Sequence, residues 1–192
     1  MSNTIRLGHR LDRSEIYGPG LRSVFWTQGC TLACKGCWNT QYWASRGGLE
    51  IGVSQILNEL DQLEGIEGIT LLGGEPLQQP GASLELIKGC KEKGLTVFLY
   101  TGYDLSEFDE TMQACFDLSD IAVTGRYVQE LRDTTLRWRG SRNQQVHFIS
   151  ELYDESVLQE QTEVECHILP NGEIRMVGYA EPELSRLLEG LI

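Results

Sequence analysis

The chain has 192 residues, a length that favours one domain with its own hydrophobic core over two enzymatic domains. Hydrophobic residues make up 41% and charged residues 23%, with 21 Gly and 5 Pro, and this composition excludes a disordered or collagen-like chain. The net charge of −12 argues against phosphate backbones and anionic membrane surfaces as partners, so we expect neither nucleic-acid nor membrane binding.

The sequence also predicts a cellular compartment. Its apolar runs fall far short of the roughly 20 residues that a membrane helix requires. The first ten residues lack the apolar segment of a secretory signal. We therefore expect a cytoplasmic protein whose thiols stay reduced. Six cysteines are too few for a disulfide scaffold, and three of them fall within eight residues.

Short apolar segments alternate with amphipathic ones along the chain. Strands are predicted at residues 21–27, 68–72, 95–100, 121–123 and 146–149. Helices are predicted at residues 53–60, 83–93 and 105–118, the second of which ends at Gly94 as a C-cap. This alternation predicts an α/β fold with a parallel sheet covered by helices, either open or curled into a partial barrel.

The C-terminal part predicts a hairpin and a closing helix. Apolar runs at residues 164–169 and 173–177 flank Pro170-Asn171-Gly172, and Asn-Gly is a strong hairpin signal. Residues 181–191 are amphipathic. We therefore expect a single domain over residues 1–192, with a core at about 17–150 and the hairpin and helix at about 163–191.

Functional groups in parallel α/β sheets gather beyond the carboxyl ends of the strands. Four segments follow predicted strands directly, and we expect them to lie near one another. They are residues 28–30, 73–76, 101–103 and 124–126.

Cys30, Cys34 and Cys37 place three thiols in one loop, with three and then two intervening residues. Structural zinc sites use four ligands, usually as two separated pairs, and a fourth ligand is missing here. Three thiolates suit a [4Fe-4S] cluster whose fourth iron stays open to another ligand. The alternatives are a zinc knuckle or buried thiols in a tight loop.

The spacing Cys30-x3-Cys34-x2-Cys37-Trp38, together with Gly73-Gly74-Glu75-Pro76 at the next strand end, resembles the radical S-adenosyl-L-methionine (radical SAM) superfamily. The resemblance implies an incomplete parallel β/α barrel, a [4Fe-4S] cluster on the three cysteines and S-adenosylmethionine (AdoMet) on the open iron. It also implies that the glycine-rich strand end holds the amino group of AdoMet. The residues that would border AdoMet are Gly36, Cys37, Trp38, Asn39, Gly73, Gly74, Glu75, Thr101, Thr124 and Arg126.

Residues 124–144, TGRYVQELRDTTLRWRGSRNQ, narrow the resemblance to the activating enzyme of anaerobic (class III) ribonucleotide reductase. YGPGLR at residues 17–22 and TGY at residues 101–103 agree with that family. Such an activase abstracts hydrogen from a glycine of a partner protein, and its reductant would be a flavodoxin or ferredoxin. Thr124 stands where the family has Asp, so it offers a hydroxyl but no charge.

Charge is distributed unevenly along the chain. Residues 126–142 contain five Arg and two acidic residues, whereas residues 150–192 contain two Arg and ten acidic residues. The basic stretch is a candidate docking or carboxylate-binding surface, or a loop paired with the acidic tail.

Two other functions remain open at this point. One keeps the radical chemistry and changes the substrate to a peptide or a small metabolite. The other is a non-enzymatic iron–sulfur or zinc module, such as an electron carrier. The three His residues, Cys90, Cys115 and Cys166 are expected to be structural.

Overall fold

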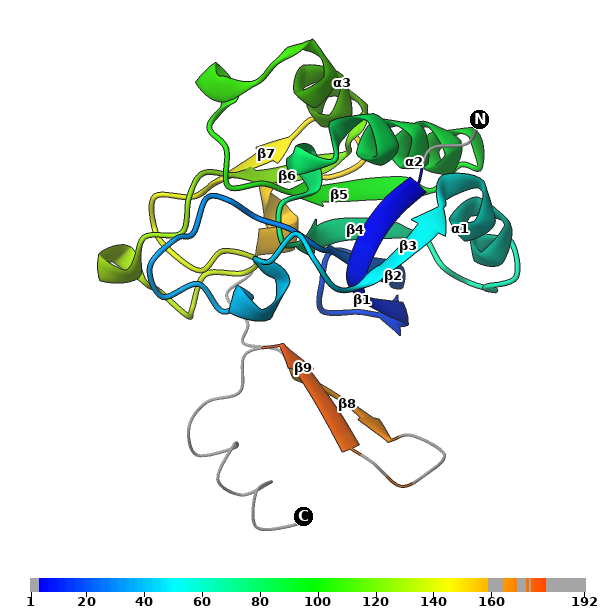
Figure 1. Cartoon of the computed structure of the whole chain (residues 1–192), viewed down its shortest axis with the longest axis horizontal. Helices are drawn as coiled ribbons and strands as arrows, with labels where there is room; N and C mark the ends of the chain where they lie inside the picture. The colour runs from blue at the N-terminus through cyan, green and yellow to red at the C-terminus, as the bar shows by residue number, and fades with distance from the viewer. Residues whose placement is uncertain (1–3, 159–163, 169–171, 173, 179–192) are drawn as a thin grey trace.

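The computed structural model describes residues 4–158, 164–168, 172 and 174–178. Its main sheet has seven strands in the order β3-β1-β2-β4-β5-β6-β7 (Figure 1). These strands are β1 (Thr4–Ser14), β2 (Arg22–Thr27), β3 (Leu49–Gly52), β4 (Gly68–Gly73), β5 (Thr96–Tyr100), β6 (Ile121–Thr124) and β7 (Gln145–Phe148).

The centre of the sheet is parallel and its two margins are antiparallel. Strands β2, β4, β5 and β6 pair in parallel, whereas β1 pairs antiparallel with β2 and β3, and β7 pairs antiparallel with β6. The predicted α/β class is therefore confirmed, and all five predicted strands are present. The predicted parallel sheet is confirmed at the centre, and β7 pairs antiparallel with β6 after the long connection of residues 125–144.

The sequence analysis missed β1 and β3. β1 contains charged and polar residues over most of its length, and only Ile5, Leu7 and Ser14 are buried in it. β3 is a four-residue edge strand that pairs with Thr4 to Leu7. Both gain their strand conformation from pairing rather than from an apolar pattern, so their own residues carry a weak signal.

Three helices are present among the described residues: α1 (Val53–Leu60), α2 (Pro80–Glu92) and α3 (Glu110–Leu118). α1 matches its prediction, and α2 begins three residues early because Pro80 occupies the first helical position. Gly94, with φ of 75°, follows the end of α2 as predicted. Short 3₁₀ turns lie at Thr40–Tyr42, Pro76–Gln78, Leu105–Glu107, Gln129–Leu131 and Glu155–Leu158.

The predicted helix at residues 105–118 is shorter in the structure. Asp109 accepts a hydrogen bond from the backbone N–H of Met112 at 2.8 Å and caps α3 there. Residues 105–107 form a separate 3₁₀ turn, closed by a capping box between Asp104 and Glu107. Two acidic caps therefore divide what the periodicity predicts as one helix.

The helices cover one face of the sheet. Side chains that alternate along the central strands, such as Phe25, Leu71 and Leu99, pack with α1, α2 and α3 in the largest apolar core. The opposite face of the sheet carries Val24, Trp26 and Leu72, which pack with tyrosines from the loops. This second, aromatic face is where the functional site lies.

A separate antiparallel hairpin of β8 (Val164–Ile168) and β9 (Ile174–Gly178) lies beside the main sheet (Figure 1). The predicted hairpin is thus confirmed. The predicted helix at residues 181–191 lies outside the described residues. No helix in the described ranges is long and apolar enough to cross a membrane.

Candidate functional site

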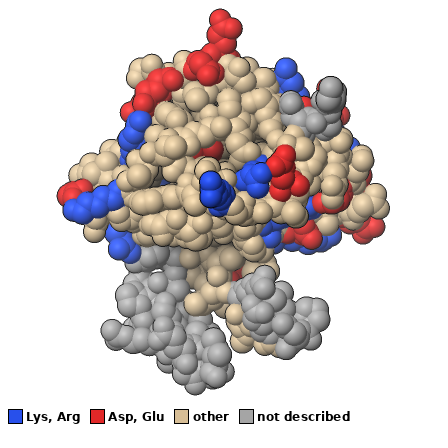
Figure 2. Space-filling model, in the orientation of Figure 1, with Lys and Arg blue, Asp and Glu red and all other residues tan. Residues whose placement is uncertain are grey.

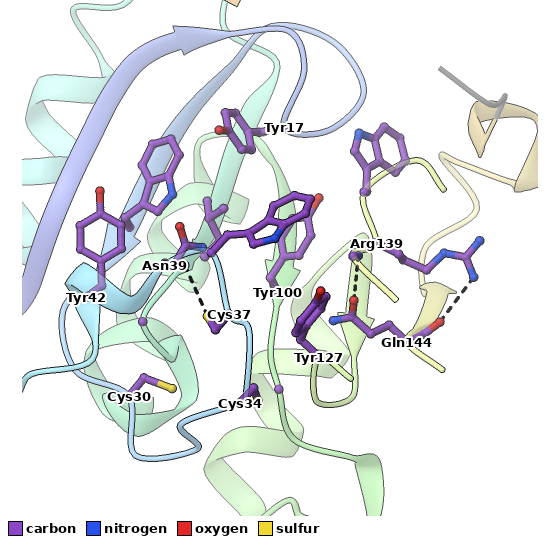
Figure 3. Close-up of a pocket in the computed structure, with 18 of the residues that line it drawn as sticks. Tyr17, Cys30, Cys34, Cys37, Asn39, Tyr42, Tyr100, Tyr127, Arg139 and Gln144 are labelled. Atoms are coloured by element: carbon purple, nitrogen blue, oxygen red, sulfur yellow. Dashed lines mark hydrogen bonds between the residues drawn. The ribbon is translucent and has the colours of Figure 1, made fainter. Parts of the chain in front are cut away.

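A cavity of about 720 Å³ opens on the aromatic face of the sheet. One wall consists of the cysteine loop and the ends of β4 and β5, and the segment that carries Arg139 and Gln144 forms the opposite wall (Figure 3). The end of β9 also lines the cavity. Its volume lies within the range of roughly 300–1,000 Å³ that is usual for small-molecule and cofactor sites. The segments that follow β2, β4 and β5 meet here, as the sequence analysis predicted.

Cys30, Cys34 and Cys37 all line this cavity and are all partly buried. The loop begins at the end of β2 and is fixed by backbone bonds, including Cys30 N–H to the carbonyl of Trp43 at 3.0 Å. A tight turn joins Cys37 N–H to the carbonyl of Cys34 at 3.1 Å. Ala33 supports this turn with φ of 47°. The backbone thus presents three thiols on the same side of one loop (Figure 3).

The donor set fits an iron–sulfur cluster better than a single metal ion. Within the described residues, no three His, Cys, Asp or Glu side chains are placed to hold one metal ion. A single zinc ion needs its thiolate ligands about 2.3 Å from one point, whereas a four-iron cluster offers each thiolate its own iron atom. Burial raises the pKa of Cys30 and Cys34. An adjacent cation is needed to favour their thiolate forms, and cluster iron supplies that charge.

Gly73 and Gly74 allow the end of β4 to approach the cysteine loop closely. A Cβ on Gly74 would lie 2.5 Å from the carbonyl oxygen of Gly29 and 2.8 Å from that of Thr27. A Cβ on Gly73, where φ is 107°, would lie 2.5 Å from the Cα of Trp26. Since both contacts are with main-chain atoms, only glycine fits at these positions.

Glu75 follows the two glycines and is buried, with 1% of its surface exposed. Its carboxyl accepts hydrogen bonds from Thr101 Oγ1 at 2.9 Å, Gly102 N–H at 2.8 Å and Leu77 N–H at 2.9 Å. Desolvation nevertheless raises the pKa of Glu75 to about 7, against the lowering effect of these bonds. The residue therefore couples the end of β4 to the end of β5 and adds a carboxyl to the cavity wall.

The opposite wall is held by Gln144. Its Oε1 accepts hydrogen bonds from Gly140 N–H at 2.9 Å and Ser141 N–H at 3.2 Å, and its Nε2 donates to the carbonyl of Gly125 at 3.1 Å. Arg139 lines the same wall and donates from Nη1 to the Gln144 carbonyl at 3.4 Å (Figure 3). Gln144 thus joins residues 125, 140 and 141 into one wall.

Trp138 supports this wall from behind. It adopts φ of 61°, which is rare for a residue with a side chain. Its indole N–H donates to the carbonyl of Ile16 at 3.2 Å, and its ring packs edge-on against Phe98 at 5.1 Å. These contacts fix the strained backbone.

Trp38 and Asn39 complete the cysteine side of the cavity. Asn39 N–H donates to the sulfur of Cys37 at 3.4 Å, a contact typical of thiolate ligands. Trp38 is largely exposed and lies 6.4 Å from Tyr127, while the guanidinium of Arg132 lies 5.2 Å from its ring. Trp38 thus lies at the cavity with Tyr127 and Arg132 beside its ring.

Gly36, Thr124 and Arg126 are near the site but do not line the cavity. Thr124 Oγ1 is hydrogen-bonded to His147 Nε2 at 2.9 Å, a link from β6 to β7. Arg126 pairs with Glu107 at 2.5 and 2.7 Å, which raises the pKa of Arg126 and lowers that of Glu107 to about 2. A direct contact between these residues and AdoMet stays a prediction.

Sequence reasoning did not single out the tyrosines of the cavity. Tyr17, Tyr42 and Tyr100 surround its interior (Figure 3). Tyr17 packs edge-on against Trp26 at 5.0 Å. Tyr100 is the last residue of a predicted strand, and its alternation with Leu99 indicates the face opposite the helices. Because side chains alternate between the two faces of a strand, this position could have been predicted to face the cavity.

The arrangement defines an iron–sulfur protein with a cavity beside its cluster loop. Residues 16–147 match the family model described as "4Fe-4S single cluster domain". Two relatives are named anaerobic ribonucleoside-triphosphate reductase-activating protein. The Haemophilus influenzae protein is 35% identical over 69% of this chain and 90% of its own length, and the Escherichia coli K12 protein is 34% identical over 70% and 92%.

This chain belongs to the family of the anaerobic ribonucleoside-triphosphate reductase-activating proteins. It is also 36% identical to the pyruvate formate-lyase-activating enzyme of Clostridium pasteurianum, over 51% of this chain and 44% of that enzyme. The predictions of a [4Fe-4S] cluster, of AdoMet and of a radical SAM activating enzyme agree with this family.

Proposed function

We propose that this protein activates a glycyl-radical enzyme of the anaerobic ribonucleotide reductase type. The observation that carries the proposal is the shared cavity, because the three thiols and the Gly73-Gly74-Glu75 strand end open into the same space. When bound, the reduced cluster supplies the electron that cleaves the sulfonium of AdoMet, giving methionine and the 5′-deoxyadenosyl radical. The cavity would bring that radical to a glycine Cα of the partner, and hydrogen transfer between them would give 5′-deoxyadenosine and a glycyl radical.

In this proposal Cys30, Cys34 and Cys37 hold the cluster. The carbonyl groups beside Gly73 and Gly74 and the carboxyl of Glu75 accept hydrogen bonds from the amino group of AdoMet. Thr101 keeps the Glu75 carboxyl in place through its 2.9 Å hydrogen bond. Support comes from the glycine positions, where main-chain atoms approach too closely for any side chain.

Other residues border the remainder of AdoMet. Trp38 and Asn39 line the cavity and would flank the adenosine. The sulfonium and ribose would then lie between the two walls, where aromatic side chains exclude water from the reacting atoms. Residues 1–192 form one radical SAM domain, with the core at about 17–150, whose aromatic sheet face is the inner face of an incomplete β/α barrel.

The protein acts in the cytoplasm with two protein partners. One is the glycyl-radical enzyme, and the other is a one-electron donor such as a flavodoxin or ferredoxin. An incomplete barrel suits a protein-sized substrate, since one side of the cavity remains open to it.

The test uses the reconstituted protein under anaerobic conditions with a reductant, AdoMet and the anaerobic reductase of the same organism. We expect 5′-deoxyadenosine and the glycyl doublet in the electron paramagnetic resonance (EPR) spectrum. Cys34→Ala removes a cluster ligand, so it abolishes the cluster absorbance and both products. Cys90→Ala is the matched control, because Cys90 is buried in α2 away from the cavity, and it keeps them. Full AdoMet cleavage by Cys34→Ala, or a modified small molecule with no glycyl doublet, would contradict the proposal.

A further inference from the structure

The hairpin of β8 and β9 lies C-terminal to residues 16–147, the part of the chain that the iron–sulfur family model matches. It therefore lies outside the matched residues. Its contacts with the main sheet, its place at the cavity and the chemistry of its two faces together indicate its role.

One face of the hairpin contacts the end of β1 and the segment that follows it. Glu165 accepts hydrogen bonds from Ser14 Oγ and from Glu15 N–H, each at 2.6 Å. Gly178 N–H donates to the hydroxyl of Tyr17 at 3.3 Å. Tyr17 also lines the cavity, so the same residue contacts the hairpin and forms part of the cavity wall.

The end of β9 forms part of the cavity rim. Met176, Val177 and Gly178 line the cavity. Met176 remains 38% exposed although it lines the cavity, which places it at the mouth. A polypeptide that enters the cavity from this side passes Met176.

The other face of the hairpin is apolar and exposed. Directly opposed residues in an antiparallel pair share a face, and the pairs Cys166–Met176 and Ile168–Ile174 therefore lie together. Ile168 is 76% exposed and Ile174 is 40% exposed. Glu165, which bonds to Ser14 and Glu15, lies on the opposite face. The apolar face is therefore exposed at Ile168 and Ile174 and reaches the mouth of the cavity at Met176.

None of the four side chains that share this face, Cys166, Ile168, Ile174 and Met176, is Lys, Arg, Asp or Glu. On the main body, by contrast, such charged side chains are scattered over the view of Figure 2. On a chain with a net charge of −12, an uncharged apolar face next to the mouth of the cavity is a candidate interaction surface.

We propose that this hairpin face, formed by Cys166, Ile168, Ile174 and Met176, is the docking surface for the polypeptide segment that carries the partner's reactive glycine. This inference rests on the proposed function, because hydrogen abstraction requires that glycine to reach the interior of the cavity. The segment packs its apolar side chains on Ile168 and Ile174 and passes Met176, which places the glycine Cα beside the bound cofactor. The hairpin is thus a specificity element for the partner protein and takes no part in AdoMet cleavage.

The experiment compares the full-length wild type with the double variant Ile168→Glu/Ile174→Glu. AdoMet cleavage without the partner and glycyl-radical formation against reductase concentration are both measured. Charged side chains on the docking face raise the half-saturating concentration of reductase about tenfold, as the loss of central interface anchors does. AdoMet cleavage stays within about twofold of wild type, because neither isoleucine lines the cavity.

Leu152→Glu is the matched control, since Leu152 is 65% exposed and lies outside the hairpin and the cavity. It leaves both measurements unchanged. Glu165→Ala is the second variant. It removes the hydrogen bonds from Ser14 and Glu15 to the hairpin without altering the apolar face. It also raises the half-saturating concentration of reductase while AdoMet cleavage is retained.

Three outcomes would overturn the docking surface. A double variant that activates the reductase as well as the wild type does would remove its basis. Loss of AdoMet cleavage together with activation would make the hairpin a structural wall instead. A wild-type dimer in sedimentation that the double variant converts to monomers would assign the face to self-association. Failure of the proposed function is a different result, in which the wild type cleaves AdoMet and forms no glycyl radical at any reductase concentration.

Discussion

The two walls of the cavity are built in different ways. The wall beside the cysteine loop is fixed by main-chain contacts between neighbouring parallel strands, and Gly74 N–H donates to the carbonyl of Thr27 at 2.8 Å. The opposite wall is held by side-chain bonds between distant segments, such as the indole N–H of Trp138 to the carbonyl of Ile16. A cluster and its cofactor need fixed geometry, which main-chain contacts supply. A wall held by side-chain bonds can change by substitution without rebuilding the sheet.

The largest effect is expected where the first wall is broken. Gly74→Ala places a methyl group 2.5 Å from the carbonyl oxygen of Gly29, and neither backbone can move without disturbing the sheet. We expect the free energy of unfolding to fall by about 4 kcal/mol and AdoMet binding to be lost. Denaturant unfolding and calorimetry measure the two quantities.

Gly81→Ala is the control for that substitution. Nothing lies within 4 Å of a Cβ at Gly81, which is in the first turn of α2. It should keep wild-type stability or gain up to about 1 kcal/mol, because Ala favours the helix. Equal stability of the Gly74→Ala and Gly81→Ala variants would show that the strand end is not closely packed.

Glu75 gives the first wall a dependence on pH. Its pKa is about 7 in the folded protein and 4.5 in its ordinary state, so the native form holds the proton more tightly. The stability that this proton confers is present below about pH 4.5 and is lost as the pH rises through about 7. Glu75→Gln removes the titration. The unfolding free energy of wild type minus variant should therefore fall by about 2–3 kcal/mol between pH 5 and pH 8.

Glu75→Gln also loses one hydrogen bond. The bond from Gly102 N–H to Oε2 fails when an amide nitrogen replaces that oxygen, which adds a constant offset at all pH values. The test is therefore whether the difference in unfolding free energy changes with pH, and its constant part is not used. A difference that does not change from pH 5 to pH 8 would mean that Glu75 is ionised throughout this range.

The smallest effect is expected on the second wall. Trp138→Phe keeps the packing on Phe98 and removes the hydrogen bond to Ile16. The free energy of unfolding should fall by about 1 kcal/mol, and AdoMet cleavage should stay within about threefold of wild type. A loss as large as that of Gly74→Ala would show that the two walls do not differ in rigidity.

Local signals in the sequence indicated the first wall. Three cysteines, two glycines and Glu75 lie within short contiguous segments, and the alternation of strands and helices predicted that these segments meet. The marginal strands β1 and β3 were missed because their own residues give no strong local signal. β1 is stabilised by pairing with β2 and β3, and its own residues lack a strong apolar alternation.

The basic stretch at residues 126–142 shows a mixed outcome. Arg139 lines the cavity, but Arg126 points to Glu107 and Arg132 lies over Trp38. Residue type and charge alone do not distinguish these three environments, since all three arginines occupy one irregular segment. The same holds for Thr124, whose hydroxyl bonds to His147 across the antiparallel pair of β6 and β7.

The sequence by itself determined the family, the loop of three cysteines, the parallel centre of the sheet and the hairpin, because each depends on residues that are close together in the chain. Only the tertiary structure decided which side chains enclose the cavity. Tyr17 and Gly178 are 161 residues apart, yet their hydrogen bond joins the hairpin to the site. Such contacts join segments that are far apart in the chain, and a local sequence pattern does not specify which distant segments will meet.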